Sequence, residues 1–345
     1  MDIFGQSLTK RELLQRVGDL SQIADAREGR LSSGRADGMR VIDVKTGSGL
    51  AFSVFPSRGM DIGWAGYRGI PLSHISKSGV VKPEFYEKDG RSFLRSFTCG
   101  LLTSCGLTQM GTPCEHEGES LGLHGRISNI PAHEVFTEKV WEGDEYKLRI
   151  GGKVRESRIF GENMQLDRRI EACLGRSTIT IHDTVSNFGF MPAPLMLLYH
   201  INLGYPLVSA DSEVQISIPV QTTPRDETAV RGLDGLWSLS DPVHGFQEQV
   251  FFHELDSRYE ECTVTVYNRR LAFGLYLKFP VRDFPHICHW KMMGEGDYVL
   301  GIEPCTVPPI GRARAAGRGI LPMLDPLQER HFHLEIGVVE ANTAI

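Results

Sequence analysis

Three features of the sequence predict an all-β fold built from two large antiparallel sheets packed face to face. Apolar and polar residues alternate in short runs from about residue 40 to the end of the chain, as they do along half-buried strands. Gly, Pro, Asn and Asp separate these runs, and the chain holds 37 Gly and 18 Pro. Helical periodicity is hard to find beyond the N-terminal segment. The alternating runs are residues 39–46, 50–57, 146–155, 177–186, 213–220, 262–268, 272–279, 298–303 and 331–339.

The N-terminal segment predicts one short helix. Ser7 or Thr9 can cap the sequence KRELLQRV, and Gly18 can end the helix in the left-handed conformation. We expect residues 1–40 to form this helix and an extension packed on the main domain. Residues 41–345 are expected to form one sandwich domain, because no Pro/Ser-rich linker, low-complexity tract or fixed-period repeat divides them.

Composition and charge point to a small-molecule partner. The formal net charge is -6, and Lys and Arg are spread along the chain rather than gathered in a basic patch, so no nucleic-acid partner is expected. No apolar run approaches the roughly 20 residues that span a bilayer, and the N-terminus has no apolar core typical of a signal peptide. Seven cysteines without a C-x-x-C pair suit reduced thiols. We therefore expect a cytoplasmic protein without a membrane partner, and we allow for a homodimer.

The apolar run LLYHINLGYP, residues 197–206, carries two polar side chains. In a strand His200 and Asn202 point to the same face, while Tyr199 and Ile201 point to the other. A buried imidazole whose two nitrogens are bonded to backbone would explain His200 as a structural residue. On an accessible sheet face the same ring could instead donate a proton near neutral pH.

A carboxyl group ends another apolar run, DYVLGIEPC. Glu303 stands directly before a proline, and glutamate is seldom fully buried unless it is paired. A neighbouring Arg could provide that pairing. At the rim of a pocket, however, the pKa of the carboxyl group can be adjusted for work as a general base.

The segment 98–131 is rich in Gly, Cys and polar residues and weak in periodicity, so we expect a loop over the mouth of the sheet. His124 lies in it between glycines and is followed by Arg126. Both residues could donate hydrogen bonds to hydroxyl oxygens, although a loop histidine is often simply solvated.

Two further stretches offer groups for a ligand. His289 and Trp290 are adjacent, and an indole face beside polar donors suits the apolar face of a sugar ring, although a structural Trp is the alternative. In PSRGMDIG we expect Arg58 and Asp61 on opposite faces of one strand, as ligand groups or as a structural ion pair.

Phosphate and metal sites are weakly indicated. The basic stretch GRARAAGRG, residues 311–319, lacks the spacing of a P-loop and is expected to be a solvated loop. Cys105, Cys114, His116 and His124 match no usual zinc spacing, so we expect no metal and no other cofactor.

Three of these motifs together resemble the aldose 1-epimerase (galactose mutarotase) family. LYHINLGYP resembles the family's N-H-x-Y-F-N-L strand, LHGRISN resembles its L-H-G-G loop, and YVLGIEPCT resembles the strand that carries its catalytic Glu. Nearly the full length of the chain resembles the aldose-epimerase-like branch known as DUF4432. The resemblance implies a galactose mutarotase-like β-supersandwich with a carbohydrate site on its concave face.

By motif, the resemblance implies that His200 is the general acid, that Glu303 is the general base and that His124 binds the sugar. Asn202, His289 and Trp290 are further candidates for sugar contacts. The family's N-R-[IV] motif has no clear counterpart, and Arg58 or Arg126 is the candidate replacement. At the position of a substrate-binding Asp the sequence HGFQEQVFF offers Gln247.

The function implied is cofactor-free mutarotation of a sugar or sugar derivative. One group takes the proton of the anomeric hydroxyl and another protonates the ring oxygen, so we expect His200 and Glu303 to face each other across a sugar-sized gap. One alternative is a catalytically altered sugar-binding module, because the family's Arg and Asp are missing. Another is a metal-dependent keto-sugar isomerase or lyase that uses the region of His124.

Overall fold

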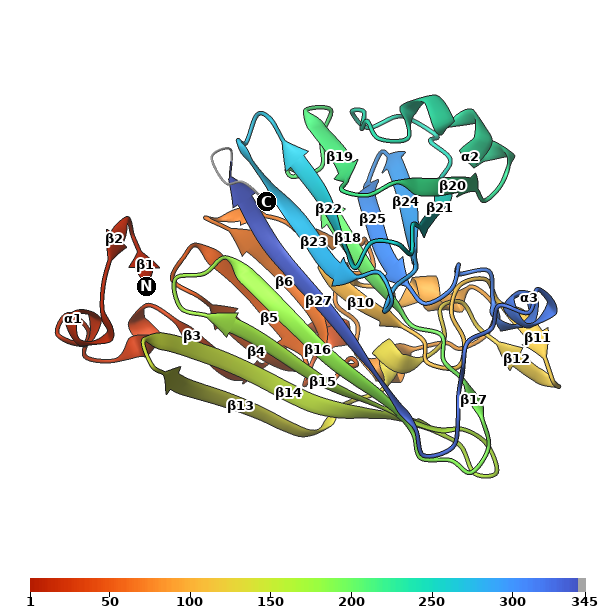
Figure 1. Cartoon of the computed structure of the whole chain (residues 1–345), viewed down its shortest axis with the longest axis horizontal. Helices are drawn as coiled ribbons and strands as arrows, with labels where there is room; N and C mark the ends of the chain where they lie inside the picture. Colours follow the sequence, from red (N-terminus) through yellow and green to blue (C-terminus); the bar gives the residue numbers. More distant parts are fainter. Residues whose placement is uncertain (341–345) are drawn as a thin grey trace.

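The computed structural model describes residues 1–340 and confirms the all-β fold (Figure 1). Two large antiparallel sheets lie face to face, and the described chain holds only short helices. The α-helices are α1 (Lys10–Leu14), α2 (Glu227–Arg231) and α3 (Arg312–Gly317). The 3-10 helices are Leu20–Gln22, Gly34–Ala36, Pro83–Phe85, Ser92–Arg95, Ile127–Asn129 and Leu233–Gly235. No helix within residues 1–340 is long and apolar enough to cross a membrane.

The larger sheet has 11 strands. In spatial order they are β20 (Val220–Pro224), β21 (Gln249–Leu255), β24 (His286–Gly294), β25 (Asp297–Cys305), β18 (Leu198–Gly204), β10 (Leu102–Cys105), β6 (Asp61–Tyr67), β5 (Leu50–Phe55), β4 (Arg40–Lys45) and β3 (Asp25–Arg30), with β7 (Ile70–Pro71) paired to β6. Segments far apart in sequence thus become neighbours, and β18 lies between β10 and β25.

The smaller sheet has eight strands. In spatial order they are β13 (His133–Glu142), β14 (Glu145–Ser157), β15 (Asn163–Cys173), β16 (Thr178–Asn187), β27 (Glu329–Glu340), β23 (Phe273–Pro280), β22 (Glu261–Asn268) and β19 (Ser212–Ile216). Two-stranded sheets are formed by β1 (Asp2–Ile3) with β2 (Gln6–Ser7), β8 (His74–Ile75) with β9 (Cys99–Gly100), β11 (Cys114–His116) with β12 (Glu119–Leu121), and β17 (Ala193–Pro194) with β26 (Met323–Leu324).

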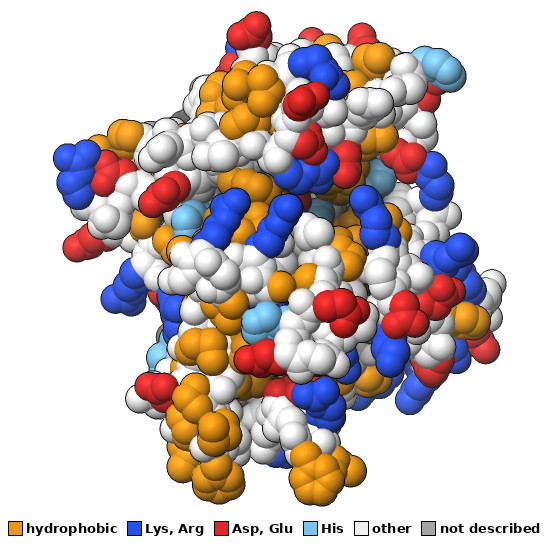
Figure 2. Space-filling view, turned by 90° about the vertical axis from the view of Figure 1, so that its right-hand side faces the viewer, with side chains coloured by type: hydrophobic (Ala, Val, Ile, Leu, Met, Phe, Trp, Pro, Cys, Tyr) orange, Lys and Arg blue, Asp and Glu red, His pale blue; other side chains and the backbone are white. Residues whose placement is uncertain are grey.

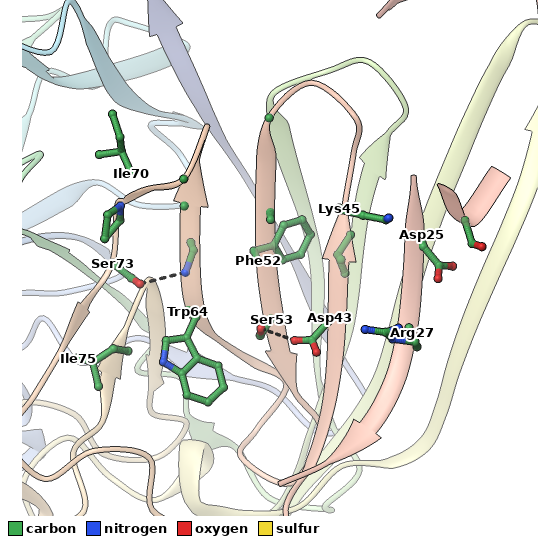
Figure 3. Close-up of a pocket in the computed structure, with 18 residues that line it drawn as sticks. Asp25, Arg27, Asp43, Lys45, Phe52, Ser53, Trp64, Ile70, Ser73 and Ile75 are labelled. Carbon is green, nitrogen blue, oxygen red and sulfur yellow. Dashed lines mark hydrogen bonds between the residues drawn. The ribbon is translucent and has the colours of Figure 1, made fainter. Parts of the chain in front are cut away.

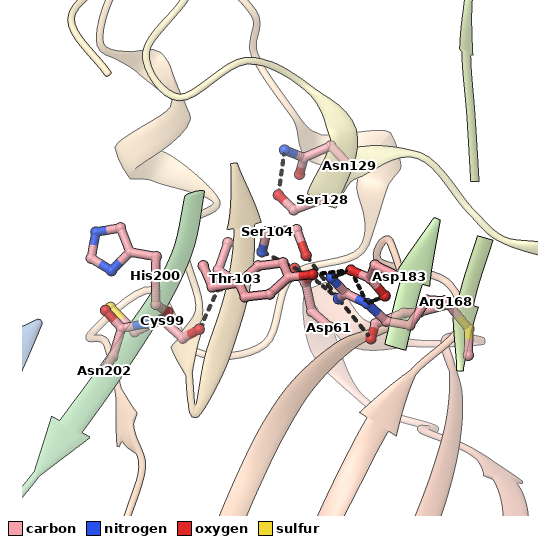
Figure 4. Close-up of polar contacts among 12 residues, drawn as sticks. Asp61, Cys99, Thr103, Ser104, Ser128, Asn129, Arg168, Asp183, His200 and Asn202 are labelled. Atoms are coloured by element: carbon pink, nitrogen blue, oxygen red, sulfur yellow. Dashed lines mark hydrogen bonds and ion pairs between the residues drawn. The ribbon is translucent and has the colours of Figure 1, made fainter. Parts of the chain in front are cut away.

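Strand β18 shows how the alternation of side chains separates the core from the outer face. Tyr199, Ile201 and Leu203 are buried in the main core between the two sheets. His200 and Asn202 point to the opposite side, as the sequence predicted (Figure 4). The core therefore fixes the strand from behind and leaves its outer face for polar groups.

A buried cluster of charged groups joins the two sheets behind His200 (Figure 4). Arg168 on β15 donates to both carboxylate oxygens of Asp183 on β16, with Nη2 2.6 Å from Oδ2, and its Nη1 donates to the hydroxyl of Ser104 on β10 at 2.8 Å. The Tyr199 hydroxyl donates to Asp183. Because a buried charge is costly unless it is paired, this network ties strands of both sheets to one geometry.

Two details of the predicted N-terminal helix differ in the structure. Thr9, not Ser7, is the N-cap, and it forms a capping box with Glu12. The helix ends at Leu14, well before Gly18, with Gln15 as its C-cap in the right-handed conformation. Strand β3, residues 25–30, lies within the segment expected as an extension and forms an edge of the larger sheet.

Two segments expected as loops contain regular structure. Segment 98–131 includes β10, whose four residues are all buried and therefore show no period-2 alternation. The basic stretch 311–319 forms α3 rather than a solvated loop. Its Arg312 is buried, and Nη2 lies 3.0 Å from the Glu119 carboxylate.

Candidate active site

The candidate site lies on the outer face of the larger sheet, where β18 and β25 are paired. His200 Nε2 and Glu303 Oε1 are 3.3 Å apart, and the two side chains are only 5% and 2% exposed. The structure therefore corrects the expected sugar-sized gap between them, because at this distance the groups are in contact. A ligand that contacts both side chains therefore has to lie above the His200–Glu303 pair, because no space for it remains between the two groups.

Glycine at position 301 makes room for the Glu303 side chain. A Cβ atom at Gly301 would lie 2.5 Å from Glu303 Oε1, which is too close for any larger residue without movement of the carboxyl group. Cys288 on β24 lies directly across from Glu303 in the sheet. Burial raises the pKa of Glu303 to about 8, although the neighbouring Cys288 thiol acts in the opposite direction.

The imidazole of His200 is enclosed by aromatic rings. Its centroid lies 5.0 Å from that of Phe97, 5.4 Å from that of His124 and 5.4 Å from that of Trp290. Burial, followed by the charge of His124, lowers the pKa of His200 well below its usual value. Within residues 1–340 the Nδ1 atom of His200 has no hydrogen-bond partner, so this ring is not the backbone-bonded structural histidine considered above.

His124 reaches the site from the loop after β12. Its backbone is left-handed at φ 60°, its N–H donates to the Gly111 carbonyl at 3.0 Å, and its carbonyl accepts from Gly106. Burial and the nearby charge of Arg91 lower the pKa of His124 to about 4. A neutral imidazole with an Nδ1 that has no partner in the described chain therefore faces His200.

These groups line a cavity of about 110 Å³. Its wall combines aromatic rings, two arginines and two glutamates, and it reaches the surface beside Arg91 and Leu94, which are exposed. Figure 2 shows the face on the side of α3, where Lys and Arg side chains gather across the middle with histidines between them. The His200–Glu303 pair is thus buried without being sealed from solvent.

Three charged residues of the wall, Arg91, Arg225 and Glu248, were missed from the sequence. Glu248 accepts a hydrogen bond from the Trp290 indole at 3.0 Å, and Arg225 Nη2 donates to the same carboxylate at 3.1 Å. The indole is therefore held by a carboxylate that is in turn held by a guanidinium. The signal for Glu248 was available, because it shares strand parity with Val250 and Phe252, which also line the cavity. We see no such signal for Arg225, which precedes α2.

A family model described as a domain of unknown function (DUF4432) matches residues 36–338. The chain belongs to the DUF4432 family. Among curated protein sequences none matches this DUF4432 chain.

Solved structures share the fold of this DUF4432 protein. A Klebsiella pneumoniae protein provisionally assigned as an aldose 1-epimerase is 24% identical with a TM-score of 0.86, over 92% of this chain and 84% of that one. A galactose mutarotase-like protein from Clostridium acetobutylicum is 13% identical with a TM-score of 0.63, over 92% and 99%. Galactose 1-epimerase from Lactobacillus acidophilus is 12% identical with a TM-score of 0.58, over 92% and 100%. At these identities the likeness establishes a galactose mutarotase-like fold.

In the DUF4432 chain three of the predicted binding residues do not line the cavity. Asn202 donates from Nδ2 to the His200 carbonyl at 2.8 Å and so braces the strand. Arg126 Nη2 lies 3.7 Å from Glu119, away from the aromatic wall. Gln247 is exposed and contacts Thr228, while its neighbour Glu248 takes the place in the cavity.

The structure does not bring Arg58 and His289 to the cavity. Arg58 lies in the turn before β6 rather than on the strand; it is buried, and its Nη1 donates to the Val81 carbonyl at 2.6 Å. His289 points away from Trp290, and its Nδ1 lies 3.4 Å from Nε2 of His253. The position of His289 follows from side-chain direction along β24, which one residue of register reverses.

Ligand groups for a metal ion do not gather in the described chain. Residues 1–340 contain no group of three or more His, Cys, Asp or Glu side chains that could hold one. The seven cysteines are all free thiols, as their spacing predicted.

Proposed function

We propose that this protein is a cofactor-free isomerase of the aldose 1-epimerase type, which interconverts the anomers of a sugar or sugar derivative. The observation that carries the proposal is the buried contact between His200 and Glu303 at the base of an open cavity. The fold shared with aldose 1-epimerase-like proteins supports it. The free cysteines agree with work in the cytoplasm.

The pair holds the single proton that the reaction needs. The pKa of Glu303 is raised by burial to about 8 and that of His200 is lowered, so near neutral pH a protonated carboxyl group lies against a neutral imidazole. One member can then give a proton while the other takes one. Charged forms of both groups would instead have to be stabilised in a poorly hydrated site.

Mutarotation suits two groups that touch. The anomeric hydroxyl and the ring oxygen are bonded to the same carbon, so a sugar lying over the pair presents both oxygens to adjacent atoms. Removal of the hydroxyl proton and protonation of the ring oxygen break the bond between that oxygen and C1, which leaves an open-chain aldehyde. Rotation about C1–C2 and the reverse transfers close the ring as the other anomer, and the pair regains its starting proton.

We keep His200 as the general acid and Glu303 as the general base. Because the resting proton lies on Glu303, this assignment includes its transfer to His200 across the 3.3 Å contact when the sugar binds. Hydroxyl groups of the sugar would stabilise the carboxylate that the transfer creates, since hydrogen bonds to the charged form lower its pKa. Nitrogen chemical shifts of His200 in the free protein and in a sugar complex test this step.

The wall of the cavity suits a sugar. The Trp290 indole offers an apolar face, while Arg225 and Glu248 offer donors and acceptors to hydroxyl groups. Arg91, at the entrance, adds a further donor, and His124 adds a neutral ring nitrogen. Arg225 and Glu248 supply the guanidinium and carboxylate whose family motifs are missing, which removes the reason to prefer a sugar-binding module without turnover.

Anomer exchange measured by NMR saturation transfer across a panel of aldoses tests the proposal. Glu303→Gln and His200→Ala are expected to slow exchange by about 10²–10⁴-fold. Glu254→Gln, an exposed glutamate of the same sheet, should retain the wild-type rate. Equal exchange in the site variants and in wild type would refute the assignment. Activity that disappears with a chelator and returns with zinc or manganese would favour the metal-dependent alternative.

A further inference from the structure

A second hollow lies on the outer face of the same sheet, over strands β3 to β6 (Figure 3). It has a volume of about 730 Å³ and is open to solvent. None of the residues that line it belongs to the wall of the catalytic cavity. The strands that carry it occupy the opposite end of the sheet from β24 and β25.

The strand register places four polar or aromatic side chains in one row across this hollow. Arg27 on β3 is paired with Asp43 on β4, and Asp43 is paired with Ser53 on β5, whose hydroxyl donates to it at 2.6 Å. Trp64 on β6 continues the row (Figure 3). The row therefore alternates a cation, an anion, a hydroxyl and an indole.

The next row forms the floor of the hollow. It runs from Lys45 through Ala51 to Gly66, again as paired neighbours. Ala and Gly project almost nothing above the sheet, so a depression forms beside the indole, and Lys45 lies at its far side. The depression is therefore a consequence of small side chains at two paired positions.

The indole of Trp64 is held in place although it is 40% exposed. The Phe55 ring packs edge-on against it at 5.3 Å with an interplanar angle of 89°. Gly63 makes this possible, because a Cβ atom there would lie 2.1 Å from the Phe55 ring. A rigid indole with an accessible surface loses little conformational freedom when a flat apolar ligand covers it.

We propose that this hollow is a second, non-catalytic saccharide site, which takes a neutral pyranoside. The sugar ring lies against Trp64, and its hydroxyl groups bond to Arg27, Asp43 and Ser53. Arg27 forms no ion pair within residues 1–340, and Asp43 accepts only from Ser53 there, so both have free hydrogen-bonding capacity. Isolated charges of both signs around an aromatic ring suit hydroxyl groups, whereas a protein partner would have to desolvate them.

Methyl glycosides test this site without involving the proposed catalysis, because a blocked anomeric carbon cannot open. Saturation-transfer difference NMR and tryptophan fluorescence with methyl galactopyranosides and glucopyranosides should report binding to wild type. Trp64→Ala should weaken it about tenfold or more, and Trp64→Phe less. His200→Ala should bind these glycosides as wild type does.

Absence of binding by every glycoside of the panel, or equal affinity of wild type and Trp64→Ala, would overturn the second site. Loss of binding in His200→Ala would also overturn it, because the glycoside would then occupy the catalytic cavity. Failure of the proposed function has a different signature, since it leaves glycoside binding at Trp64 intact and removes only anomer exchange.

A separate observation concerns one end of the sandwich, where large apolar side chains are exposed. Phe160, Phe190, Ile159 and Met191 are exposed by 106%, 84%, 82% and 76%. Leu327 follows at 67% in the turn before β27. We call these five residues the terminal apolar patch, and Figure 2 shows hydrophobic side chains projecting at this lower end of the molecule.

Hydrogen bonds hold the loops of the patch together. Asn163 accepts from the Phe188 N–H at 2.8 Å through its carbonyl and donates to the Phe188 carbonyl through its side chain. Asn187 donates to the carbonyls of Met191 at 2.9 Å and Leu324 at 3.0 Å. These bonds hold the loops of the patch in place, so little conformational entropy is lost when the patch is buried.

We infer that the terminal apolar patch is the contact surface for a second copy of this chain. Phe side chains bury about 150–250 Å² each, so the five residues and their surroundings approach the roughly 800 Å² per partner of a stable interface. The adjacent ion pair of Arg158 with Glu162, at 3.2 Å, places both signs of charge at the rim. In two copies related by a two-fold axis, the cation of one rim can pair with the anion of the other. An anionic membrane would instead favour a rim that carries cations alone.

Light scattering coupled to size exclusion tests this interface. Wild type should have the mass of a dimer at micromolar concentration, and Phe160→Ser with Phe190→Ser should give a folded monomer by circular dichroism. Phe136→Ser, which removes an exposed ring from β13, should remain dimeric. A monomeric wild type, a double variant that stays dimeric, or wild-type binding to phosphatidylglycerol vesicles as a monomer would overturn the assignment.

Discussion

The outer face of the larger sheet carries two hollows that differ in how deeply their charged groups are buried. In the cavity over β18 and β25, His200 and Glu303 are almost fully buried, and burial moves the pKa of each toward its neutral form. In the hollow over β3 to β6, Arg27, Asp43 and Lys45 are exposed to water. Acid–base chemistry needs the first environment, whereas recognition of hydroxyl groups can use the second.

The largest expected effect separates the two hollows by catalysis. Glu303→Gln and His200→Ala should each slow anomer exchange by about 10²–10⁴-fold, because each removes one positioned proton-transfer group. Asp43→Asn, the matched carboxyl change in the open hollow, should leave the exchange rate within about twofold. NMR exchange rates at saturating sugar compare the site variants with Asp43→Asn. An equal loss of rate in Asp43→Asn would show that the hollows are not independent.

A second change concerns the wall of the cavity. Glu248→Gln keeps the side-chain volume but weakens the hydrogen bonds to Trp290 and Arg225, so kcat/KM should fall about 10–100-fold. Exposed Glu295→Gln is the control. If Glu248→Gln behaves like its control, the Arg225–Glu248–Trp290 arrangement plays no part in binding the sugar.

The pH dependence of stability is a third expected difference between the two hollows. The Glu303 carboxyl ionises near pH 4.5 in the unfolded chain but only near pH 8 in the folded one, so between these values the folded chain binds more protons. The contribution of the Glu303 carboxyl group to the free energy of unfolding is therefore fully present below about pH 4.5 and is lost as the pH rises toward 8. Glu303→Gln should therefore raise the free energy of unfolding by on the order of 2 kcal/mol at pH 7 and little at pH 4.5.

Denaturant unfolding of wild type and Glu303→Gln at the two pH values measures this difference. Asp43→Asn should change stability by less than about 0.5 kcal/mol at both, as an exposed substitution does. A destabilised Glu303→Gln at pH 7 would mean that the carboxyl group is ionised and paired in the folded chain.

The smallest expected effect is that of Trp64→Ala on catalysis. Because Trp64 lies outside the cavity that holds His200 and Glu303, anomer exchange of a free aldose should remain within about twofold of wild type. Exchange rates at several sugar concentrations check this expectation. A rise in KM of tenfold or more would indicate that the two hollows are not independent.

The sequence predicted many of the strands, but alternation alone did not decide which: β15 was missed although the burial of its side chains alternates along most of its length. Strand β10 escaped notice because all four of its residues are buried, so no period of two marks it. In β18 the alternation correctly placed Tyr199 in the core and His200 on the outer face. In β10 no such pattern is present, and the pairing of β10 with β6 and β18 reveals the strand.

At the candidate site the sequence correctly indicated ionisable residues that lie within apolar runs. His200 and Glu303 do so, and the structure brings them into contact. Gln247 was chosen where Glu248 lines the cavity, because one residue of register exchanges the two faces of a strand. Arg225 comes from a connection between strands, and its approach to Trp290 depends on tertiary packing that no local pattern encodes.

The charged cluster behind β18 has a consequence for engineering. Tyr199, the residue before His200, is held by Asp183, which Arg168 holds in turn from the other sheet. Transplanting β18 into a different scaffold would therefore leave the Tyr199 phenol facing a foreign interior, unless Asp183 and Arg168 of the other sheet were moved with it. A minimal version of this protein has to retain both layers, even though only one of them carries the proposed sugar site.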